Sequence, residues 1–480
     1  MRRADSLVAG SVLIWTVLII TILSLVAAEL LQVVSGKYYS TLHTAVWQEA
    51  LLAAESGVDL AIMELRKSLY PAPNHAWEGW NTMTGDGVTN YGLQTIPNAG
   101  LAATPMTIEV TVDAPLQLKD PQNSWQYYRI RTTGTMPITG PARASDNKQD
   151  TRLRKLSLRL DRFTDGVLTS HAVDSPHVSR RIEAIVRPVS SFDQAIMSVG
   201  ALNLNDADII IDSYDSRDPN KSTSGLYDAT KRQENGDIAT DGNLINAGNA
   251  HIYGDVATNA GTVSGVANVS GVQRTDFYQE PIPVAAPSWT SINPSPMIVS
   301  GTTDLAANAV EGSSASRYII NSITLSGGQV LDLTGNAQGT PTYIEIYVTG
   351  DISSTGNSQI VLQPGVKAKI YFAGNTTITG NGLVNINNQP GDLLMYGITP
   401  PPNTSRTLEL GGNGELSAAV YAPDYDVNIH NSGTRGTVFG SFVGKTVTMS
   451  GVTDLHYDEA LGSGGVINSY KIVSWFEDTR

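Results

Sequence analysis

The chain has 480 residues, 41% hydrophobic and 16% charged, and a formal net charge of −14. This length exceeds one ordinary domain, and the composition is typical of folded rather than disordered proteins. The acidic balance argues against general nucleic-acid binding, which needs clustered Lys and Arg. Because the chain has no cysteine, disulfides, Cys-ligated metals and thiol catalysis are excluded.

An apolar segment from Leu7 to Leu31 follows Arg2 and Arg3. It is long enough to cross a bilayer as a helix, which takes roughly 20 residues. The preceding arginines predict a single pass through the inner membrane, with the N-terminus cytoplasmic and the bulk periplasmic. A signal peptide cleaved near Glu29 is the alternative. The expected anchor residues are Val12, Leu13, Ile14, Leu18, Ile19, Ile20, Leu23 and Leu25.

The helical pattern continues beyond the apolar segment. Leu51, Ala54, Val58, Ile62 and Leu65 recur every three or four residues, so one face stays apolar while others become polar. We therefore expect residues 1–70 to form a leader and one long helix, apolar at first and amphipathic later, with a break near the prolines at positions 71 and 73.

Two short stretches of this helix resemble a known family. Gly10-Ser11 stands just before the apolar core, and the stretch from Gln48 to Val58 is similar to a signature of PilX-type minor pilins of type IV pili. The resemblance implies cleavage between Gly10 and Ser11 by a prepilin peptidase, and other pilins or the pilus assembly machinery as partners. One departure is Trp15, where most pilins carry Glu. An uncleaved membrane anchor is the alternative.

Residues 71–190 alternate between apolar and polar side chains in short runs. The runs cover 106–112, 125–132, 152–162 and 180–187. Period-2 alternation between turn residues predicts an antiparallel sheet with one wet face. Packed against the preceding helix, such a sheet would form a pilin-like headpiece of α+β class.

Residues 191–461 are rich in Gly, Asn, Thr, Ser and β-branched residues, and they repeat. Gly236-Asp237-Ile238-Ala239-Thr240 returns as Gly254-Asp255-Val256-Ala257-Thr258, and apolar strand cores recur roughly every 20 residues. This spacing predicts an all-β solenoid, for which we favour a right-handed parallel β-helix over a β-sandwich. A Pro-rich excursion near 280–296 divides it into two lobes, and residues 462–480 are expected to be a C-terminal tail.

A second resemblance lies in this region. The segments 212–217, 419–423, 440–445 and 456–461 look like a recurrent domain found behind PilX-like N-termini. That resemblance reinforces the solenoid and implies no catalytic role.

The sequence has no zinc, nucleotide or serine-hydrolase motif. One acidic group, Asp206, Asp208, Asp212 and Asp215, could supply oxygen ligands to Ca²⁺. The alternative is that these acids solvate turns and discourage edge aggregation.

We therefore expect a non-enzymatic, pilin-like subunit that displays the β domain for surface contact or adhesion, either at the membrane or outside the cell as part of a pilus. The main alternative is a stand-alone envelope protein that binds carbohydrate or protein through the solenoid. A polysaccharide-active enzyme is a further alternative, although no motif points to it.

Overall fold

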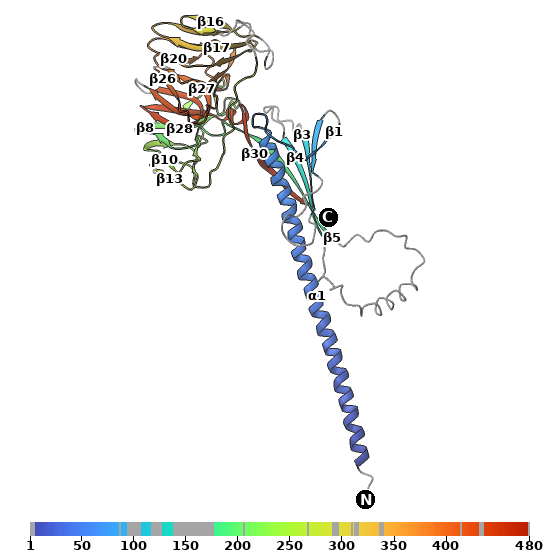
Figure 1. The fold of residues 1–480 in the computed structure, drawn as a ribbon. Coiled ribbons are helices and arrows are strands. Elements are labelled where there is room, and N and C mark those ends of the chain that lie inside the picture. Colours follow the sequence, from blue (N-terminus) through green and yellow to red (C-terminus); the bar gives the residue numbers. More distant parts are fainter. Residues whose placement is uncertain are drawn as a thin grey trace.

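The computed structural model describes residues 5–85, 88–93, 107–116, 127–137, 177–204, 207–265, 268–289, 297–308, 311, 316–335, 340–412, 415–431 and 436–478. The predicted strand at 152–162 and the residue Asp206 lie outside these ranges. Figure 1 shows a long helix that rises from the N-terminus to a small sheet, with a larger β body beyond it. One long N-terminal helix followed by a mostly β body is the architecture that the sequence predicts.

The helix and the small sheet use both ends of the chain. Their elements are α1 (Asp5–Lys67), β1 (Asn81–Gly85), β2 (Val88–Leu93), β3 (Thr107–Leu116), β4 (Tyr127–Pro137), β5 (His177–Ser190) and β30 (Ile467–Asp478). At 63 residues, α1 is about 95 Å long. It ends at Lys67, close to the predicted break. We call the sheet and the α1 segment from Val46 to Lys67 the headpiece.

The headpiece sheet is antiparallel throughout, with the strand order β1-β2-β3-β4-β5-β30. Helix α1 lies on one face, mainly over β4 and less over β5 and β3. The predicted tail at 462–480 is wrong for its described part from Ile467 to Asp478, because β30 pairs with β5 as the last strand of this sheet. Its alternation is interrupted by a bulge between Ile472 and Ser474, so the sequence lacks the regular period of a half-buried strand.

The larger body, which we call the β-stack, has two lobes. The first lobe contains β6 (Ile196–Ser198), β7 (Leu202–Leu204), β8 (Ala207–Tyr214), η1 (Ala229–Lys231), β9 (Ile238–Thr240), β10 (Leu244–Asn246), β11 (Asn249–Ile252), β12 (Val256–Thr258), β13 (Thr262–Ser264) and β14 (Gln273–Arg274). The second lobe contains β15 (Met297–Val299), β16 (Thr303–Ala306), β17 (Ser316–Leu325), β18 (Val330–Thr334), β19 (Thr342–Val348), β20 (Ile352–Ser354), β21 (Gln359–Leu362), β22 (Val366–Phe372), β23 (Thr376–Ile378), β24 (Gly382–Asn385), η4 (Pro390–Asp392), β25 (Leu393–Gly397), β26 (Arg406–Gly412), β27 (Leu416–Asn431), β28 (Gly436–Ser450), β29 (Thr453–Asp458) and η5 (Glu459–Ser463).

Successive turns of the β-stack pair in parallel register. One ladder runs through β17, β19, β22, β25, β27 and β28, and another through β20, β23, β26, β27 and β28. A separate sheet has the order β16-β18-β21-β24. Because parallel register repeats each side-chain position from turn to turn, aliphatic residues form buried columns. One such column joins Val447, Leu202, Ile245 and Val263, of which the first three are fully buried.

Some corners of the stack admit only glycine. Gly380 has φ +81°, and a Cβ there would overlap the carbonyl oxygen of Gly356 in the neighbouring turn. Close stacking of corners therefore accounts for part of the glycine content of this half of the chain.

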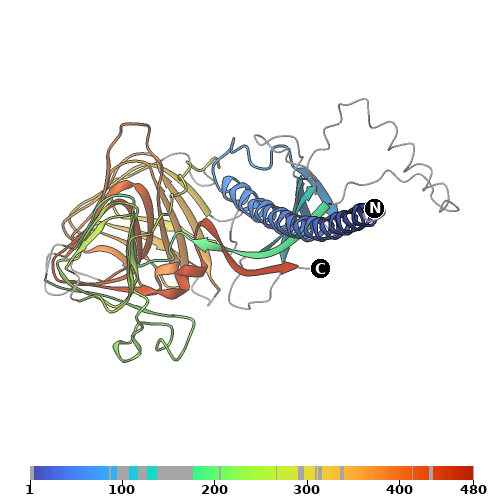
Figure 2. The same cartoon turned by 90° about the horizontal axis from the view of Figure 1, so that it is seen from below.

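The two lobes stack in the reverse of their sequence order. β28 and β29, which end the second lobe, pair with β6, β7 and β8, which begin the first. The chain thus winds from the middle of the stack to one end, and after residues 275–289 it winds from the other end back to the middle. Figures 1 and 2 show that the chain enters and leaves the stack beside the headpiece.

Candidate functional site

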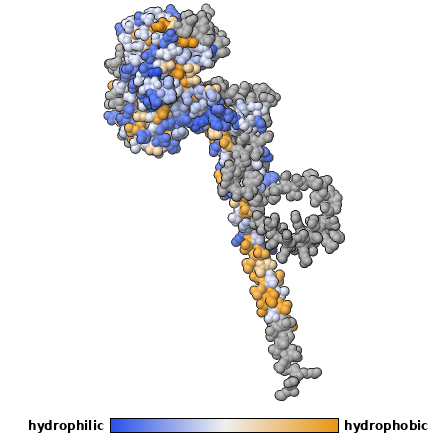
Figure 3. Space-filling view, in the orientation of Figure 1, coloured by the Kyte–Doolittle hydropathy of each residue, from blue (hydrophilic) through white to orange (hydrophobic). Residues whose placement is uncertain are grey.

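The first candidate site is the exposed part of α1. From Ile14 to Val34 its large apolar side chains are exposed, and they form the orange stalk in Figure 3. An 18-residue window of this helix has a mean hydropathy of 2.5 and no buried residue. By length and composition, α1 can therefore cross a membrane.

The predicted processing and anchor residues all lie within α1. Gly10 and Ser11 lie within α1, and cleavage between them stays a prediction. The side chains of Val12 and Leu13 lie outside the described ones. The other six predicted anchor residues are exposed apolar side chains: Ile14, Leu18, Ile19, Ile20, Leu23 and Leu25.

The second half of α1 packs on the headpiece sheet through small residues. Ala50, Ala53, Ala54 and Ala61 are buried at helical spacing. Gly57 lies so close to β3 and β4 that a Cβ there would stand 3.0 Å from three side-chain methyl carbons. These residues fall in or near the stretch that resembles the minor-pilin signature, so that stretch has a physical role, which is close contact between helix and sheet.

The sheet side of this contact also requires glycine. A Cβ at Gly134 of β4 would overlap the carbonyl oxygen of Ala50 and lie 2.6 Å from the amide nitrogen of Ala54. Both neighbours are backbone atoms of α1, so no side-chain rotation can make room. The residue type at Gly134 therefore sets how closely the helix lies on the sheet.

The C-terminal end of α1 is fixed to the loop that follows it. The buried Glu64 accepts hydrogen bonds from the backbone amide of Trp77 (2.6 Å) and from Lys67 Nζ (2.6 Å). The ring of Trp77 stacks on Tyr91 of β2, with 3.9 Å between ring centroids. These contacts tie the helix end to the sheet.

The β-stack is inserted between β5 and β30. The backbone amide of Ser191 donates to the carbonyl of Val466 (2.9 Å), where the chain enters and leaves the stack. The Pro-rich segment crosses the same region, since Ile282 donates its amide hydrogen to Asn468 Oδ1 (3.1 Å) and Glu280 pairs with Arg66 at the end of α1 (3.8 Å). Strand, helix and Pro-rich segment thus meet at one joint.

The acidic cluster predicted from the sequence is engaged in internal contacts where its side chains are described. Asp212 is 1% exposed, pairs with His456 (Oδ1 to Nδ1, 2.6 Å) and accepts from the hydroxyl of Tyr227 (2.9 Å). Asp215 pairs with Arg217 at 2.9 Å. Although burial raises the pKa of Asp215, the hydrogen bonds from Arg217 outweigh it and lower the pKa.

Calcium binding by this cluster stays a prediction. The side chains of Asp206 and Asp208 are not described, and no group of three potential metal ligands lies together among the described residues. No sequence pattern indicates the contact to His456, which lies 244 positions away and meets Asp212 through the pairing of β29 with β8.

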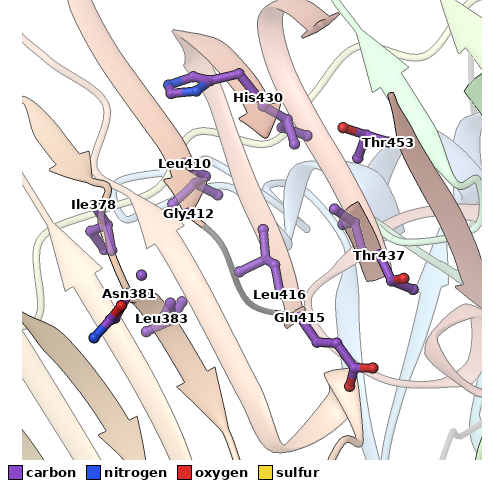
Figure 4. Close-up of a pocket in the computed structure, with 14 residues that line it drawn as sticks. Ile378, Asn381, Leu383, Leu410, Gly412, Glu415, Leu416, His430, Thr437 and Thr453 are labelled. Carbon is purple, nitrogen blue, oxygen red and sulfur yellow. The ribbon is translucent and has the colours of Figure 1, made fainter. Parts of the chain in front are cut away.

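Hollows lie among the described residues of the β-stack, and two of them can be compared with ligand pockets. The one in Figure 4 has a volume of about 30 Å³ and lies among side chains such as Ile378, Leu410 and Leu416, with the imidazole of His430 above it. His430 bonds Glu409 (3.0 Å). The other has a volume of about 130 Å³ beside Tyr343, Lys369 and Asp392. Both are smaller than the pockets that usually hold small-molecule ligands, roughly 300–1,000 Å³.

A buried acid at the end of β29, where the two lobes meet, makes the stability of the fold depend on pH. Burial raises the pKa of Asp458, although it accepts hydrogen bonds from the amides of Ser216 and Ala460. Between the ordinary value of about 3.9 and this raised pKa, the folded chain binds more protons than the unfolded chain. This group therefore adds stability as the pH falls through that window.

We expect Asp458→Asn to remove this dependence, because the amide oxygen can still accept both hydrogen bonds while the buried charge is lost. Unfolding temperatures of both chains at pH 4 and pH 7 test it. The variant should be the more stable chain at pH 7, with a smaller advantage at pH 4. An equal difference at the two pH values would contradict the assignment.

Comparison with known proteins gives limited matches. A family described as a domain of unknown function (DUF7305) matches residues 292–463. This range is less than half of the chain and nearly coincides with the second lobe. No curated protein matches the chain. Among solved structures, the chain is similar to the competence-associated pilin ComZ from Thermus thermophilus, at 11% identity over 90% of this chain and 97% of that one. The TM-score of 0.21 is too low for this likeness to carry weight.

Proposed function

We propose that this chain is a non-enzymatic, type IV pilin-like subunit, anchored by α1, that displays the β-stack at a distance from the membrane. The observation that carries the proposal is α1 itself. It is one continuous helix of 63 residues, apolar and exposed from Ile14 to Val34 and later packed through small residues on an antiparallel sheet. An apolar stalk of this kind suits either a lipid bilayer or the packed helices of a filament.

The position of the β-stack in the chain supports the proposal that the headpiece carries it away from the membrane. Both of its connections run through neighbouring strands of the headpiece, β5 and β30, so the stack is an insertion into that sheet. We interpret the stack as a parallel β-helix, because its turns pair in parallel register and bury aliphatic columns. A stack of this kind is a rigid surface for contact with a cell, a polysaccharide or another protein.

The mass of the mature N-terminal peptide tests the proposal, measured in cells with and without prepilin peptidase. We expect a chain that begins at Ser11 only when the peptidase is present. As a matched variant, Gly10→Leu should retain its N-terminal leader in both strains. If the unmodified chain keeps residues 1–10 in both strains, it is a plain anchor and the pilin proposal fails. A start near Glu29 would mean a soluble exported protein.

A further inference from the structure

The last strand of the headpiece presents an uncharged apolar edge. β30 is an edge strand of the sheet, and its segment Ile472-Val473-Ser474-Trp475-Phe476 contains neither charge nor proline. Trp475 is 45% exposed and Phe476 57% exposed. Edge strands are usually blunted by charges or proline, because an open edge pairs readily with another chain.

The exposed side chains of this edge lie on both faces of the sheet. Trp475 is paired with Ala184, one of the residues buried beneath α1, and therefore lies on the helix side. Phe476 is paired with Glu183 and lies on the opposite side. A helix docked on the sheet could cover only one of these side chains. A strand added in the plane of the sheet would contact both, and would also use the open backbone groups.

The end of β30 is held in place. Glu477 pairs with Arg180 of β5, a side chain that is almost fully buried. The guanidinium of Arg180 also lies over the ring of Trp47 in α1, 4.0 Å from its centroid. These contacts fix the segment that carries Trp475 and Phe476, so little conformational entropy would be lost when a partner strand binds.

The direction of β30 limits which strand can pair with it. Glu477 lies near Trp47, whereas Asn468 lies at the joint with Arg66, so β30 runs antiparallel to α1. If two copies paired antiparallel through β30, their α1 helices would point in opposite directions. Two chains anchored in one membrane cannot adopt that arrangement.

The opposite edge of the same sheet meets the requirement. Five antiparallel pairings separate β1 from β30, so the two edges run in opposite directions. One line of directly paired residues also runs across the sheet from β1 to β30. On β1, Asn81 and Thr82 are exposed. The line joins Thr82, Tyr91, Val112, Ile130, Ala184 and Trp475.

We propose that β30 of one copy pairs antiparallel with β1 of a second copy, which joins their headpieces into one sheet with parallel α1 helices. The contact is heterologous, so it can extend to further copies. With strands about 4.8 Å apart, neighbouring α1 helices would be about 29 Å apart, which leaves room for helices of other subunits between them. The inference rests on the proposed function only for the shared membrane orientation of the copies.

Disulfide crosslinking tests this contact, because the chain has no native cysteine. Full-length Thr82→Cys and Trp475→Cys chains, with different tags, are coexpressed and oxidised in membranes. Directly paired residues lie about 5 Å apart between Cα atoms, within disulfide range. We expect a dimer with one chain of each kind that reductant removes, and no dimer from either variant alone. Chains with both substitutions should form a ladder of oligomers.

The controls separate the possible outcomes. Leu52→Cys, at an exposed apolar position on α1, should not crosslink to Trp475→Cys. Adding Phe476→Lys to the Trp475→Cys chain should reduce the mixed dimer at least tenfold while the unfolding temperature changes little. If no mixed dimer forms with cysteine at any position from Lys471 to Phe476, the proposal is wrong. Self-crosslinking of Trp475→Cys would instead indicate pairing of β30 with β30. Failure of anchoring would appear separately, as chain in the soluble fraction.

Discussion

Gly134→Ala should detach α1 from the headpiece sheet while the β-stack stays folded. The added methyl would overlap the carbonyl oxygen of Ala50 and press on the backbone of Ala54. Since neither atom can move without the helix, we expect a loss of about 3 kcal/mol, the upper end of the usual cost of overpacking. Hydrogen exchange of the full chain in detergent should show faster exchange in α1 from residue 46 onward and in β4.

Gly36→Ala is the matched control for this substitution. Gly36 lies in an exposed part of the same helix, and apart from its own turn of helix no atom lies within 4 Å of the position that the added methyl would occupy. Because alanine is the better helix former, this variant should be slightly more stable than the unmodified chain. Unchanged protection of α1 and β4 in Gly134→Ala would contradict the close contact of helix and sheet.

Asp212→Ala should weaken the contact between the two lobes of the β-stack where β8 meets β29. Asp212 in β8 joins His456 of β29 and the hydroxyl of Tyr227, whose ring stacks on that imidazole with 3.7 Å between centroids. The substitution leaves both partners without their acceptor in a buried site. We expect a loss of about 2–6 kcal/mol, because each of the two donors left without its acceptor costs about 1–3 kcal/mol. Faster hydrogen exchange in β8 and β29 would show it.

His430→Ala is the control for the contact between Asp212 and His456. His430 bonds Glu409 at 3.0 Å, but both side chains are partly exposed, so the loss should be between 0 and about 1 kcal/mol. Should Asp212→Ala cost no more than His430→Ala, the pair formed by Asp212 and His456 does not hold the lobes together.

Local patterns are sufficient to predict the helix and the parallel turns. The period of Ala54, Val58 and Leu65 marks the face of α1 that is buried on the sheet. Repeats such as the one at Gly236 and Gly254 correspond to corners of adjacent turns, because a Cβ at Gly254 would lie 2.6 Å from the backbone of Gly236. Features set by neighbours close in sequence, or by repetition, can therefore be predicted.

The contacts that join the two lobes connect residues far apart in the sequence, so no local pattern predicts them. β28 and β29 pair with strands more than 200 residues earlier, so the reversed order of the lobes is invisible in the sequence. The same distance separates Asp212 from His456, which is why the sequence alone suggests a metal ligand at that acid. The segment of β30 resembles a tail because its bulge breaks the alternation and both of its faces are apolar.

The most direct test of the central claim is the N-terminal mass of this chain in filaments sheared from the cell surface. If α1 serves as a pilin-type helix that carries the β-stack outward, the sheared fraction contains the chain, its N-terminal peptide begins at Ser11, and peptides from the β-stack accompany it. If the chain stays wholly in the membrane fraction with residues 1–10 intact, α1 is an anchor alone and the pilin-like function is wrong.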